Sequence, residues 1–337
     1  MILSIASDQG FSGIISLVKP PYTINNRIVS LVAQIENVLG RISGLTASPK
    51  PNLELRRQNR IRSIQASLSI EGNSLDLDTV ANILDGKKVL ASKQEVQEVM
   101  NAMKAYDSLS ELSSNSLRSL LKAHSLMMHG LIDNPGKYRD KNIGIYKGTK
   151  AVHFAPQPKM LPKLMEDLFK YLKADEDHPL IKSSVFHYEF EFIHPFSDGN
   201  GRMGRLWQTL ILTEFNSIFE YLPIESLIKV KQNKYYQVLG ACDKAGASTQ
   251  FIEFMLGIIL EVLEDYSREY KVTEMGFQER IAFAKVTFQD MEFSRKQYID
   301  LLKTISTATA SRDLIEAVKL KKLKKIGKNN QSKYKFN

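Results

Sequence analysis

Apolar side chains recur every three or four residues along most of the chain, which is the spacing of one face of an α-helix. The run from Ile28 to Leu39 shows it most clearly. Similar runs predict further helices over 53–70, 75–85, 95–109, 116–129, 160–174, 183–193, 202–217, 227–244 and 249–270. The pattern therefore predicts a mainly α protein.

One stretch, residues 136–158, departs from this period. Apolar and polar residues alternate there around Gly144 and Gly148, and the stretch ends at Pro156 and Pro158. Alternation interrupted by glycine is typical of a β-hairpin. We expect a small hairpin flap on an otherwise helical protein; an ordinary surface hairpin is the alternative.

The last sixty residues have a different pattern. We expect a helix over 294–305, a turn over 306–308, a second helix over 309–325, a tight turn over 327–330 and a strand over 333–336. Helix, turn, helix and β-wing is a winged-helix pattern. The boundary before it is expected near 271–276, so the winged-helix domain covers 275–337.

Composition indicates an ordinary globular protein of two or three domains, with 337 residues, 43% hydrophobic and 25% charged. A single cysteine, Cys242, allows no internal disulfide and fits a reducing compartment. No apolar run has the length of a membrane helix, and the start of the chain lacks a signal-peptide pattern. The expected location is cytoplasmic, with no membrane contact.

The net charge of +9 is concentrated near the end of the chain. From Arg312 to Asn337 there are nine basic residues and two acidic ones. Such a tail favours contact of 309–337 with DNA or an acidic protein. A solvated lysine surface that keeps the protein soluble is the alternative.

The most informative run is HPFSDGNGRMGR, residues 194–205. Pro195 disfavours helix continuation, so His194 is expected at a helix end. Gly199 and Gly201 allow positive φ, and such a loop can turn its N–H groups inward as an anion nest. A helix starting near Arg202 would add its dipole. These residues predict a phosphate site.

Charged side chains of the same run extend this picture. Arg202 and Arg205 can both fork onto phosphate oxygens. Asp198 beside an anion suggests a bridging Mg²⁺, and His194 is a titratable base within reach. The chemistry indicates Mg²⁺-dependent transfer of part of a nucleotide. Two alternatives are surface arginines paired with acidic neighbours and a metal hydrolase that uses His187, Glu191 and His194, although no zinc pattern supports the latter.

The run matches the motif of the Fic family, H-P-F-x-D/E-G-N-G-R-x-x-R, at every specified position. The resemblance implies a Fic-type helical bundle and a protein adenylyltransferase that uses ATP and Mg²⁺. It implies that His194 is the catalytic base and that Asp198 holds the metal. The nucleotide-binding residues would be Asp198, Gly199, Asn200, Gly201, Arg202 and Arg205.

A second pattern of the family, S/T-x-x-x-E-G/N, is matched by residues 67–72. It resembles the inhibitory helix of class II, in which the glutamate pairs with the second motif arginine. The resemblance implies that Ser67 and Glu71 are inhibitory and that Glu71 competes at Arg205. The physics agrees, because a carboxylate on that guanidinium competes with phosphate.

The resemblance also gives the hairpin and a tyrosine pair roles. The flap would align the target, with Lys150, Ala151, Val152 and His153 at its tip. Tyr235 and Tyr236 resemble a pair that borders the adenine pocket, although helical aromatics are usually core. The expected domains are 1–110, an N-terminal helical segment with the inhibitory helix; 111–270, the catalytic core; and 275–337.

The expected partner is a target protein with a Tyr, Ser or Thr hydroxyl, and self-modification is also expected. Relatives of this class are often homodimers, but no interface is defined by the sequence. Two other functions stay open: removal of AMP from a modified protein by the same site, and a nucleotide-sensing winged-helix regulator that binds DNA.

Overall fold

The computed structural model describes residues 19–45, 53–147, 150–174, 176–274, 276–302, 305–327 and 332–337. The chain forms two compact units, a first unit that ends at Val262 and a C-terminal unit that starts at Leu263. Among the helices that the structure describes, none combines the length and apolar character needed to cross a membrane.

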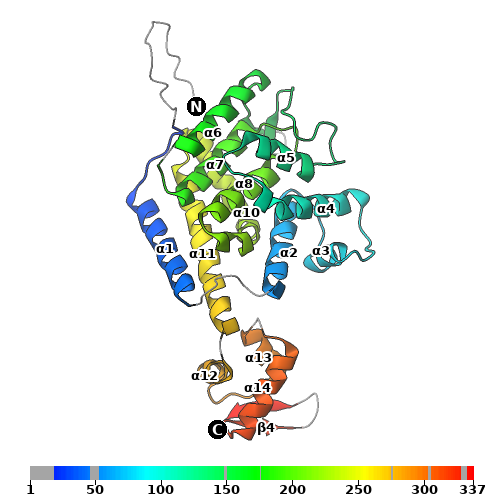
Figure 1. Cartoon of the computed structure of the whole chain (residues 1–337), viewed down its shortest axis with the longest axis vertical. Helices are drawn as coiled ribbons and strands as arrows, with labels where there is room; N and C mark the ends of the chain where they lie inside the picture. Colours follow the sequence, from blue (N-terminus) through cyan, green and yellow to red (C-terminus); the bar gives the residue numbers. More distant parts are fainter. Residues whose placement is uncertain are drawn as a thin grey trace. The chain divides into compact units, whose positions relative to one another are not determined.

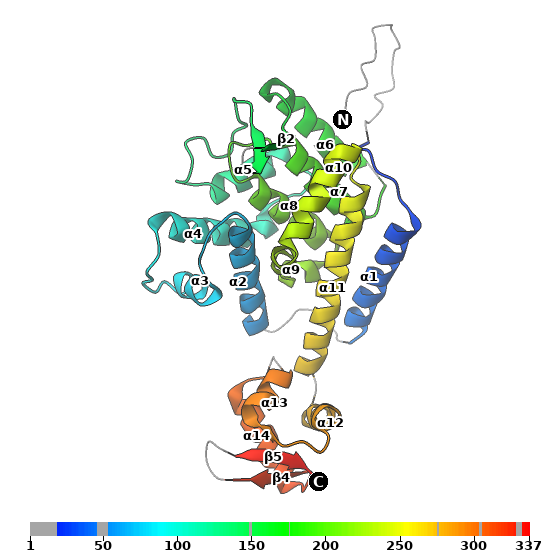
Figure 2. The same ribbon diagram turned by 180° about the vertical axis from the view of Figure 1, so that it is seen from behind.

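The first unit is built from helices, as Figures 1 and 2 show, which confirms the predicted mainly α fold. A capping box at Ser92 and Glu95 starts α4, and Asp76 caps α3. Its α-helices are α1 (Asn26–Leu45), α2 (Leu53–Ile70), α3 (Leu77–Leu84), α4 (Lys93–Asp107), α5 (Leu117–Met127), α6 (Leu161–Ala174), α7 (Pro179–Ile193), α8 (Asn200–Phe215), α9 (Ile224–Val230), α10 (Gln232–Ala245) and α11 (Thr249–Glu274).

Helices α7 and α8 form the centre of this unit. Nearly every residue of both is buried, and Trp207 of α8 packs against Phe186 of α7. The two helices approach closely at Gly204, where a Cβ would lie 2.9 Å from His187 Cδ2. The loop that joins them, which carries the first half of the motif, is therefore anchored at both ends in the core.

Strands β1 (Gly144–Lys147) and β2 (Lys150–Phe154) form an antiparallel hairpin, with an irregular register between Ile145 and Tyr146. This confirms a hairpin within the predicted stretch. The proposed target-binding residues lie in β2, but the side chains of 144–154, and so those of Lys150, Ala151, Val152 and His153, are outside the described residues.

The C-terminal unit contains, after the end of α11, α12 (Phe277–Phe288), β3 (Phe293–Ser294), α13 (Arg295–Leu302), α14 (Thr307–Lys319), β4 (Leu323–Ile326) and β5 (Lys333–Phe336). Its antiparallel sheet has the order β3-β5-β4. This is the element order of a winged helix. Its core gathers around Phe293, Tyr298 and Leu314.

The helix expected over 309–325 differs from the observed one. Helix α14 ends at Lys319, and residues 323–326 form strand β4 instead. Lys321 takes a left-handed φ of 57°, which reverses the chain after the helix. Leu323 is then buried in the core of the unit, while the next two lysines are exposed. Two neighbouring lysines interrupt the alternation of apolar and polar residues that would have predicted this strand.

Candidate active site

His194 lies at the end of α7, where its left-handed φ of 50° and Pro195 stop the helix. Its Nδ1 lies 3.2 Å from the Glu191 backbone oxygen. A carbonyl oxygen only accepts, so this contact places the hydrogen on Nδ1 and makes Nε2 the basic nitrogen of the neutral ring. The side chain is 18% exposed, so the ring is within reach of a substrate.

The loop after His194 is closed by two side chains. Asn200 bridges it, because its Oδ1 accepts from the Phe196 N–H and its Nδ2 donates to the Phe196 carbonyl, both at 2.9 Å. The His124 ring stacks on Phe196 at 3.6 Å. Its Nδ1 accepts from the Gly136 N–H, so its Nε2 donates to the Asp198 carbonyl at 3.0 Å. Burial lowers the pKa of His124 to about 4, so it is neutral at pH 7.

Arg139 supports the same loop through hydrogen bonds, a role that sequence reasoning did not predict. Its guanidinium is buried and donates from Nε to the His194 carbonyl at 2.8 Å and from Nη2 to the Pro156 carbonyl at 2.6 Å. Its backbone N–H donates to the Pro195 carbonyl. Arg139 lies outside the periodic segments and His124 on an apolar helical face, so only contacts across the fold identify them.

The two motif glycines do different work. Gly199 has the expected positive φ of 84°, but Gly201 is helical, because α8 begins at Asn200 and not near Arg202. Of the two glycines that allow positive φ, only Gly199 uses that freedom. Glycine is needed at 201 for space: a Cβ there would overlap Glu71 Oε1 and lie 3.1 Å from Arg205 Nη1.

Arg202 and Asp198 form a pair beside the start of α8. Arg202 Nη2 donates to Asp198 Oδ2 at 3.0 Å, and Nη1 lies 3.8 Å from Glu98 Oε1. The Arg202 side chain is 5% exposed, and its buried Nε has no partner among the described residues. A buried donor without a partner is costly, so Arg202 retains capacity for a ligand oxygen.

The chemistry of Asp198 fits Mg²⁺. Its side chain is 59% exposed, and its Oδ1 accepts from the Gly199 N–H at 2.6 Å. Mg²⁺ in nucleotide sites is held by one or two carboxylates, with phosphate oxygens and waters completing the octahedron. Within the described part of the chain, no three His, Cys, Asp or Glu side chains converge as a ready metal cage. One exposed carboxylate near a helix N-terminus suits a metal brought by its nucleotide.

His187 is part of the core and not a metal ligand with Glu191 and His194. Its Nδ1 lies 2.6 Å from Gln208 Oε1, and its Nε2 lies 3.1 Å from the Tyr235 hydroxyl. Both ring nitrogens are therefore used, and burial lowers the pKa of His187 to about 3. The metal-hydrolase alternative loses its support.

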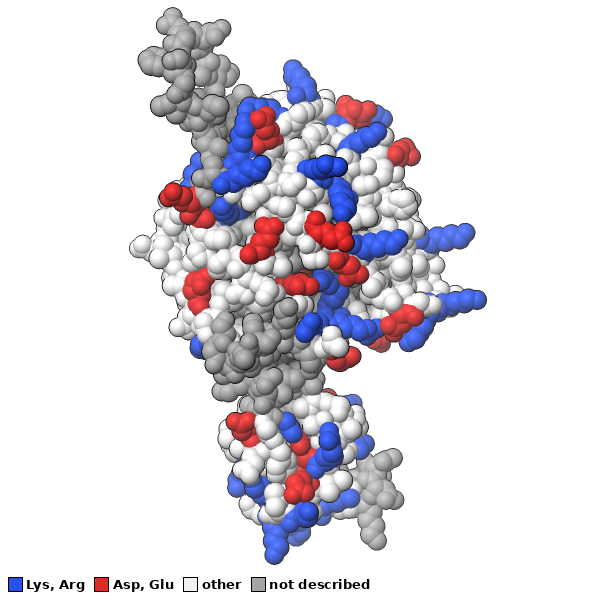
Figure 3. Space-filling model, in the orientation of Figure 1, with Lys and Arg blue, Asp and Glu red and all other residues white. Residues whose placement is uncertain are grey.

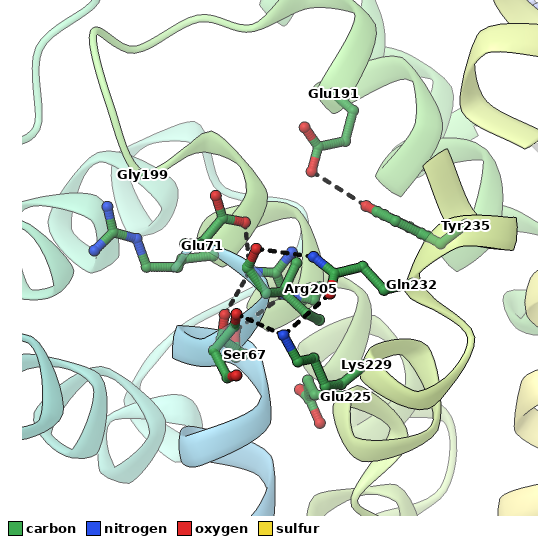
Figure 4. A network of polar contacts seen from close by, with 12 residues as sticks. Ser67, Glu71, Glu191, Gly199, Arg205, Glu225, Lys229, Gln232 and Tyr235 are labelled. Atoms are coloured by element: carbon green, nitrogen blue, oxygen red, sulfur yellow. Dashed lines mark hydrogen bonds and ion pairs between the residues drawn. The ribbon is translucent and has the colours of Figure 1, made fainter. Parts of the chain in front are cut away.

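Arg205 lies at the centre of a buried network that α2 completes (Figure 4). Its Nη2 donates to Glu71 Oε1 at 2.8 Å and to the Ser67 carbonyl at 3.0 Å, and its Nε donates to Ser67 Oγ. Burial disfavours the charge, but the Glu71 carboxylate together with Tyr235 and Glu191 outweighs it and raises the pKa of Arg205. Residues Ser67 and Glu71 thus meet the second motif arginine, 134 or more positions away.

The C-terminal end of α2 is fastened by side chains from α9 and α10. Lys229 Nζ donates to the Ser69 carbonyl at 2.8 Å, and Gln232 Nε2 donates to the Ile70 carbonyl at 3.1 Å. Carbonyls of the last turn have no partner within a helix, so these contacts satisfy them. Gly72, with φ of 97°, then turns the chain away directly after Glu71.

The tyrosine pair is divided between the interior and the surface. Tyr235 is 1% exposed, and its hydroxyl also lies 3.4 Å from Glu191 Oε1. Tyr236 is 48% exposed. Of the two, only Tyr236 presents its ring to solvent; Tyr235 packs in the core beneath the site.

Comparison with known proteins agrees with this geometry. A sequence profile of the Fic/DOC family matches residues 111–212. Protein adenylyltransferase Fic from Drosophila erecta is 28% identical over 247 residues, which covers 69% of this chain and 48% of that protein. The protein of the same name from Culex quinquefasciatus is 29% identical over 216 residues, covering 61% and 41%. The chain spans about half or less of these curated relatives.

Solved structures extend the match beyond the profile. A Fic family protein from Desulfovibrio desulfuricans G20 is 39% identical, with a TM-score of 0.70 over 95% of this chain and 98% of that one. A Fic domain-containing signaling protein from Bacteroides thetaiotaomicron VPI-5482 shares the fold at 19% identity, with a TM-score of 0.57 over 72% of this chain and 97% of that one. With the motif at the head of α8 and near-complete coverage at 39% identity, the chain belongs to the Fic/DOC family.

Proposed function

We propose that this chain transfers AMP from ATP to a hydroxyl side chain of a target protein and releases pyrophosphate. The observation that carries the proposal is that one short loop holds His194 at the end of α7 and the Asp198–Arg202 pair at the start of α8. A basic nitrogen, a metal-competent carboxylate and a guanidinium with an unused donor are the groups this reaction needs.

Each residue has a defined task in this mechanism. His194 Nε2 accepts the proton of the target hydroxyl, whose oxygen attacks the α-phosphorus. A new P–O bond forms, the bond from the α-phosphorus to the bridging oxygen breaks, and pyrophosphate leaves with that electron pair. The Gly199–Arg202 turn and the dipole of α8 hold phosphate oxygens. Asp198 would hold Mg²⁺, which neutralises phosphate charge when bound.

The same proposal includes restraint by α2. The Glu71 carboxylate contacts Arg205. It also lies beside Gly201, at the positive end of α8, in the space that a side chain at 201 would need. A triphosphate whose terminal phosphate uses Arg205 must displace that carboxylate and would be repelled by it. Glu71 therefore lowers productive ATP binding, and Ser67 helps to hold the guanidinium in place.

The acceptor class follows from the chemistry. Removal of a proton by a neutral imidazole suits the hydroxyl of Tyr, Ser or Thr. Self-modification of an exposed hydroxyl of this chain, and a homodimer that would allow it between two copies, are parts of the same proposal.

The test compares incorporation of label from ATP radiolabelled at the α-phosphorus, with Mg²⁺, into the chain and a cell extract. Glu71→Gly should label at least about tenfold more than the parent, if the carboxylate contributes an ordinary coupling energy. Glu71→Gly/His194→Ala should not label. Glu54→Gly, the same change at the exposed start of α2, is the matched control and should label like the parent.

Label from ATP marked at the γ-phosphorus separates this reaction from phosphate transfer. Its incorporation would overturn the proposal, and so would absence of α-label in every variant. Release of AMP from a pre-labelled protein, without incorporation from ATP, would assign the site to AMP removal instead.

A further inference from the structure

The C-terminal unit presents one face of a helix that its own core leaves open. Helix α14 buries Ala310, Leu314 and Ala317 in the core. Its opposite face carries Ala308, Arg312, Ile315 and Lys319, at spacings of four, three and four residues, and all of them are exposed. These side chains form a single outward stripe along the helix.

The position of α14 is fixed from behind by a buried ion pair. Arg280 donates from Nε to Asp313 Oδ2 at 2.7 Å and from Nη2 to Asp313 Oδ1 at 2.9 Å. The Tyr298 hydroxyl donates to Asp313 Oδ2 at 3.1 Å. A forked pair of this kind holds both position and rotation of the helix. The outward stripe is therefore rigidly displayed.

The hairpin of the same unit carries an unfavourable charge arrangement. Lys324 of β4 lies directly opposite Lys335 of β5, and both are exposed. Like charges at directly opposite positions destabilise a sheet. Among the described residues, Lys324, Lys325 and Lys335 form no ion pair, and only Lys333 has one, with Glu292 at 3.4 Å. Solubility alone does not require lysines placed in this register.

We infer that this unit binds double-stranded DNA, with α14 in the major groove and the β4–β5 hairpin on the phosphate backbone. The stripe has the width of one helix, which the major groove admits. Arg312 can reach base edges or phosphate, Ile315 suits a thymine methyl group, and Ala308 allows close approach. Phosphates relieve the repulsion between Lys324 and Lys335. Figure 3 shows lysine and arginine side chains, with a few acidic ones among them, on the visible face of the unit.

An acidic protein surface also attracts lysines, but the stripe on α14 distinguishes the two partners. Only one of its four side chains, Lys319, is a lysine, and that one lies 3.8 Å from Glu316 on the same helix. The stripe also carries Arg312, but its other two side chains, Ala308 and Ile315, are apolar, whereas the lysines of the unit gather on the hairpin. A helix that serves mainly as a cationic patch would not place apolar side chains between its cations. Backbone contact by one element and groove contact by the other is the division found in DNA readers.

The test measures binding of the full chain to a fluorescein-labelled DNA duplex of mixed sequence, by anisotropy at increasing KCl. Affinity should fall with salt, with a log–log slope of about −3 or steeper if at least three or four cations meet phosphates. Lys324→Glu should weaken binding by roughly tenfold or more and make the slope shallower by about one. Arg312→Ala should also weaken binding by about tenfold.

The thermal midpoint of Lys324→Glu is a second readout, which distinguishes weaker DNA binding from a folding defect. It replaces a like-charge pair with an opposite-charge pair across the hairpin, so the thermal midpoint should not fall. Lys104→Glu, the same change at an exposed position of α4, is the matched control and should leave the affinity within about twofold of the parent.

Three results would overturn the inference. They are absence of duplex binding at low salt, equal weakening by Lys104→Glu, and full duplex binding by Lys324→Glu and Arg312→Ala. Binding of a polyglutamate peptide in place of the duplex would assign the surface to an acidic protein.

Discussion

Each unit of the molecule holds a carboxylate against an arginine, Arg205 in the first unit and Arg280 in the C-terminal unit, but the two pairs are built differently. Arg280 grips both oxygens of Asp313, whose side chain is 5% exposed and has a third contact from Tyr298. Arg205 contacts one oxygen of Glu71, whose side chain is 33% exposed. The same two chemical groups therefore give a fixed brace in one unit and an exchangeable contact in the other.

The difference teaches what makes an ion pair replaceable. Arg205 keeps its contacts to the Ser67 hydroxyl and carbonyl if Glu71 leaves, so its charge is never without acceptors. Asp313 receives one further hydrogen bond, from the Tyr298 hydroxyl. An incoming phosphate can take the place of Glu71 without leaving a buried cation bare, because a phosphate oxygen accepts as a carboxylate does.

The largest expected effect is that of Asp313→Ala. It removes the carboxylate that accepts from both Nε and Nη2 of Arg280, and loss of one member of a largely buried pair costs about 3–5 kcal/mol of unfolding free energy. Hydrogen exchange of the backbone amides of the C-terminal unit, followed at increasing urea, measures the loss. Trp207, the single tryptophan, reports on the first unit and should show an unchanged midpoint. Glu316→Ala on the same helix is the control; an equal loss there would contradict the brace.

The next largest effect is that of acid, which should lower the stability of the first unit more than that of the C-terminal unit. Burial lowers the pKa values of His124 and His187 to about 4 and 3, from an ordinary value of 6.5. The unfolded chain therefore binds protons that the folded chain does not, so this stability is present above pH 6.5 and is lost as the pH falls toward the folded values. The loss at pH 5 is about 2 kcal/mol per histidine.

The midpoint of the Trp207 signal at pH 7 and pH 5 measures this loss. All six histidines lie in the first unit, so the C-terminal unit lacks this source of acid sensitivity. His187→Gln should remove about half of the pH dependence, whereas the exposed His129→Gln should leave it intact. A flat pH response of the parent would show that neither ring is held neutral by burial.

A smaller loss of stability is expected for Glu71→Gln, which tests whether the Glu71–Arg205 contact is weaker than the Asp313–Arg280 pair. The amide oxygen can still accept from Arg205, and the Ser67 contacts persist, so the expected loss of unfolding free energy is about 1 kcal/mol. The Trp207 midpoint in urea measures it. A loss as large as that of Asp313→Ala would mean that the Glu71 contact is a structural brace too.

The smallest predicted effect concerns the fastening of α2. Lys229→Met removes the donor to the Ser69 carbonyl but leaves the Gln232 contact, so α2 should detach slightly more often. AMP transfer should rise by about two- to threefold, which corresponds to roughly 0.5 kcal/mol. Label incorporation measures it, with the exposed Lys234→Met as control. An unchanged rate would show that the Lys229 contact does not restrain Glu71.

The sequence predicted the helices and the motif well, because both are local. Recurrence of apolar positions every three or four residues located α2 at its observed bounds, and Pro195 indicated the end of α7 before His194. The pairing of Glu71 with Arg205 came from a family resemblance, since no local pattern links positions 134 residues apart.

What the sequence missed depends on packing. Arg139, Lys229 and Gln232 act on carbonyls of distant segments, and a carbonyl is present at every residue, so no side-chain pattern identifies the recipient. The strand at 323–326 contains two lysines, and only the burial of Leu323 against the core distinguishes it from a continued helix. The sequence indicated only that Gly201 could take a left-handed turn. The structure shows that it is constrained by Glu71, the residue that follows α2.

The closeness of Glu71 to Gly201 has a consequence for which mutations could raise the activity. If Glu71 restrains the enzyme as proposed, a side chain at 201 would displace the Glu71 carboxylate but would itself stand at the head of α8, where the proposed phosphate contacts lie. Substitutions at 201 are then expected to lose activity even though they remove the restraint. In a selection for hyperactive alleles, survivors should cluster in codons 67–72 and leave the codons of the 199–205 segment unchanged.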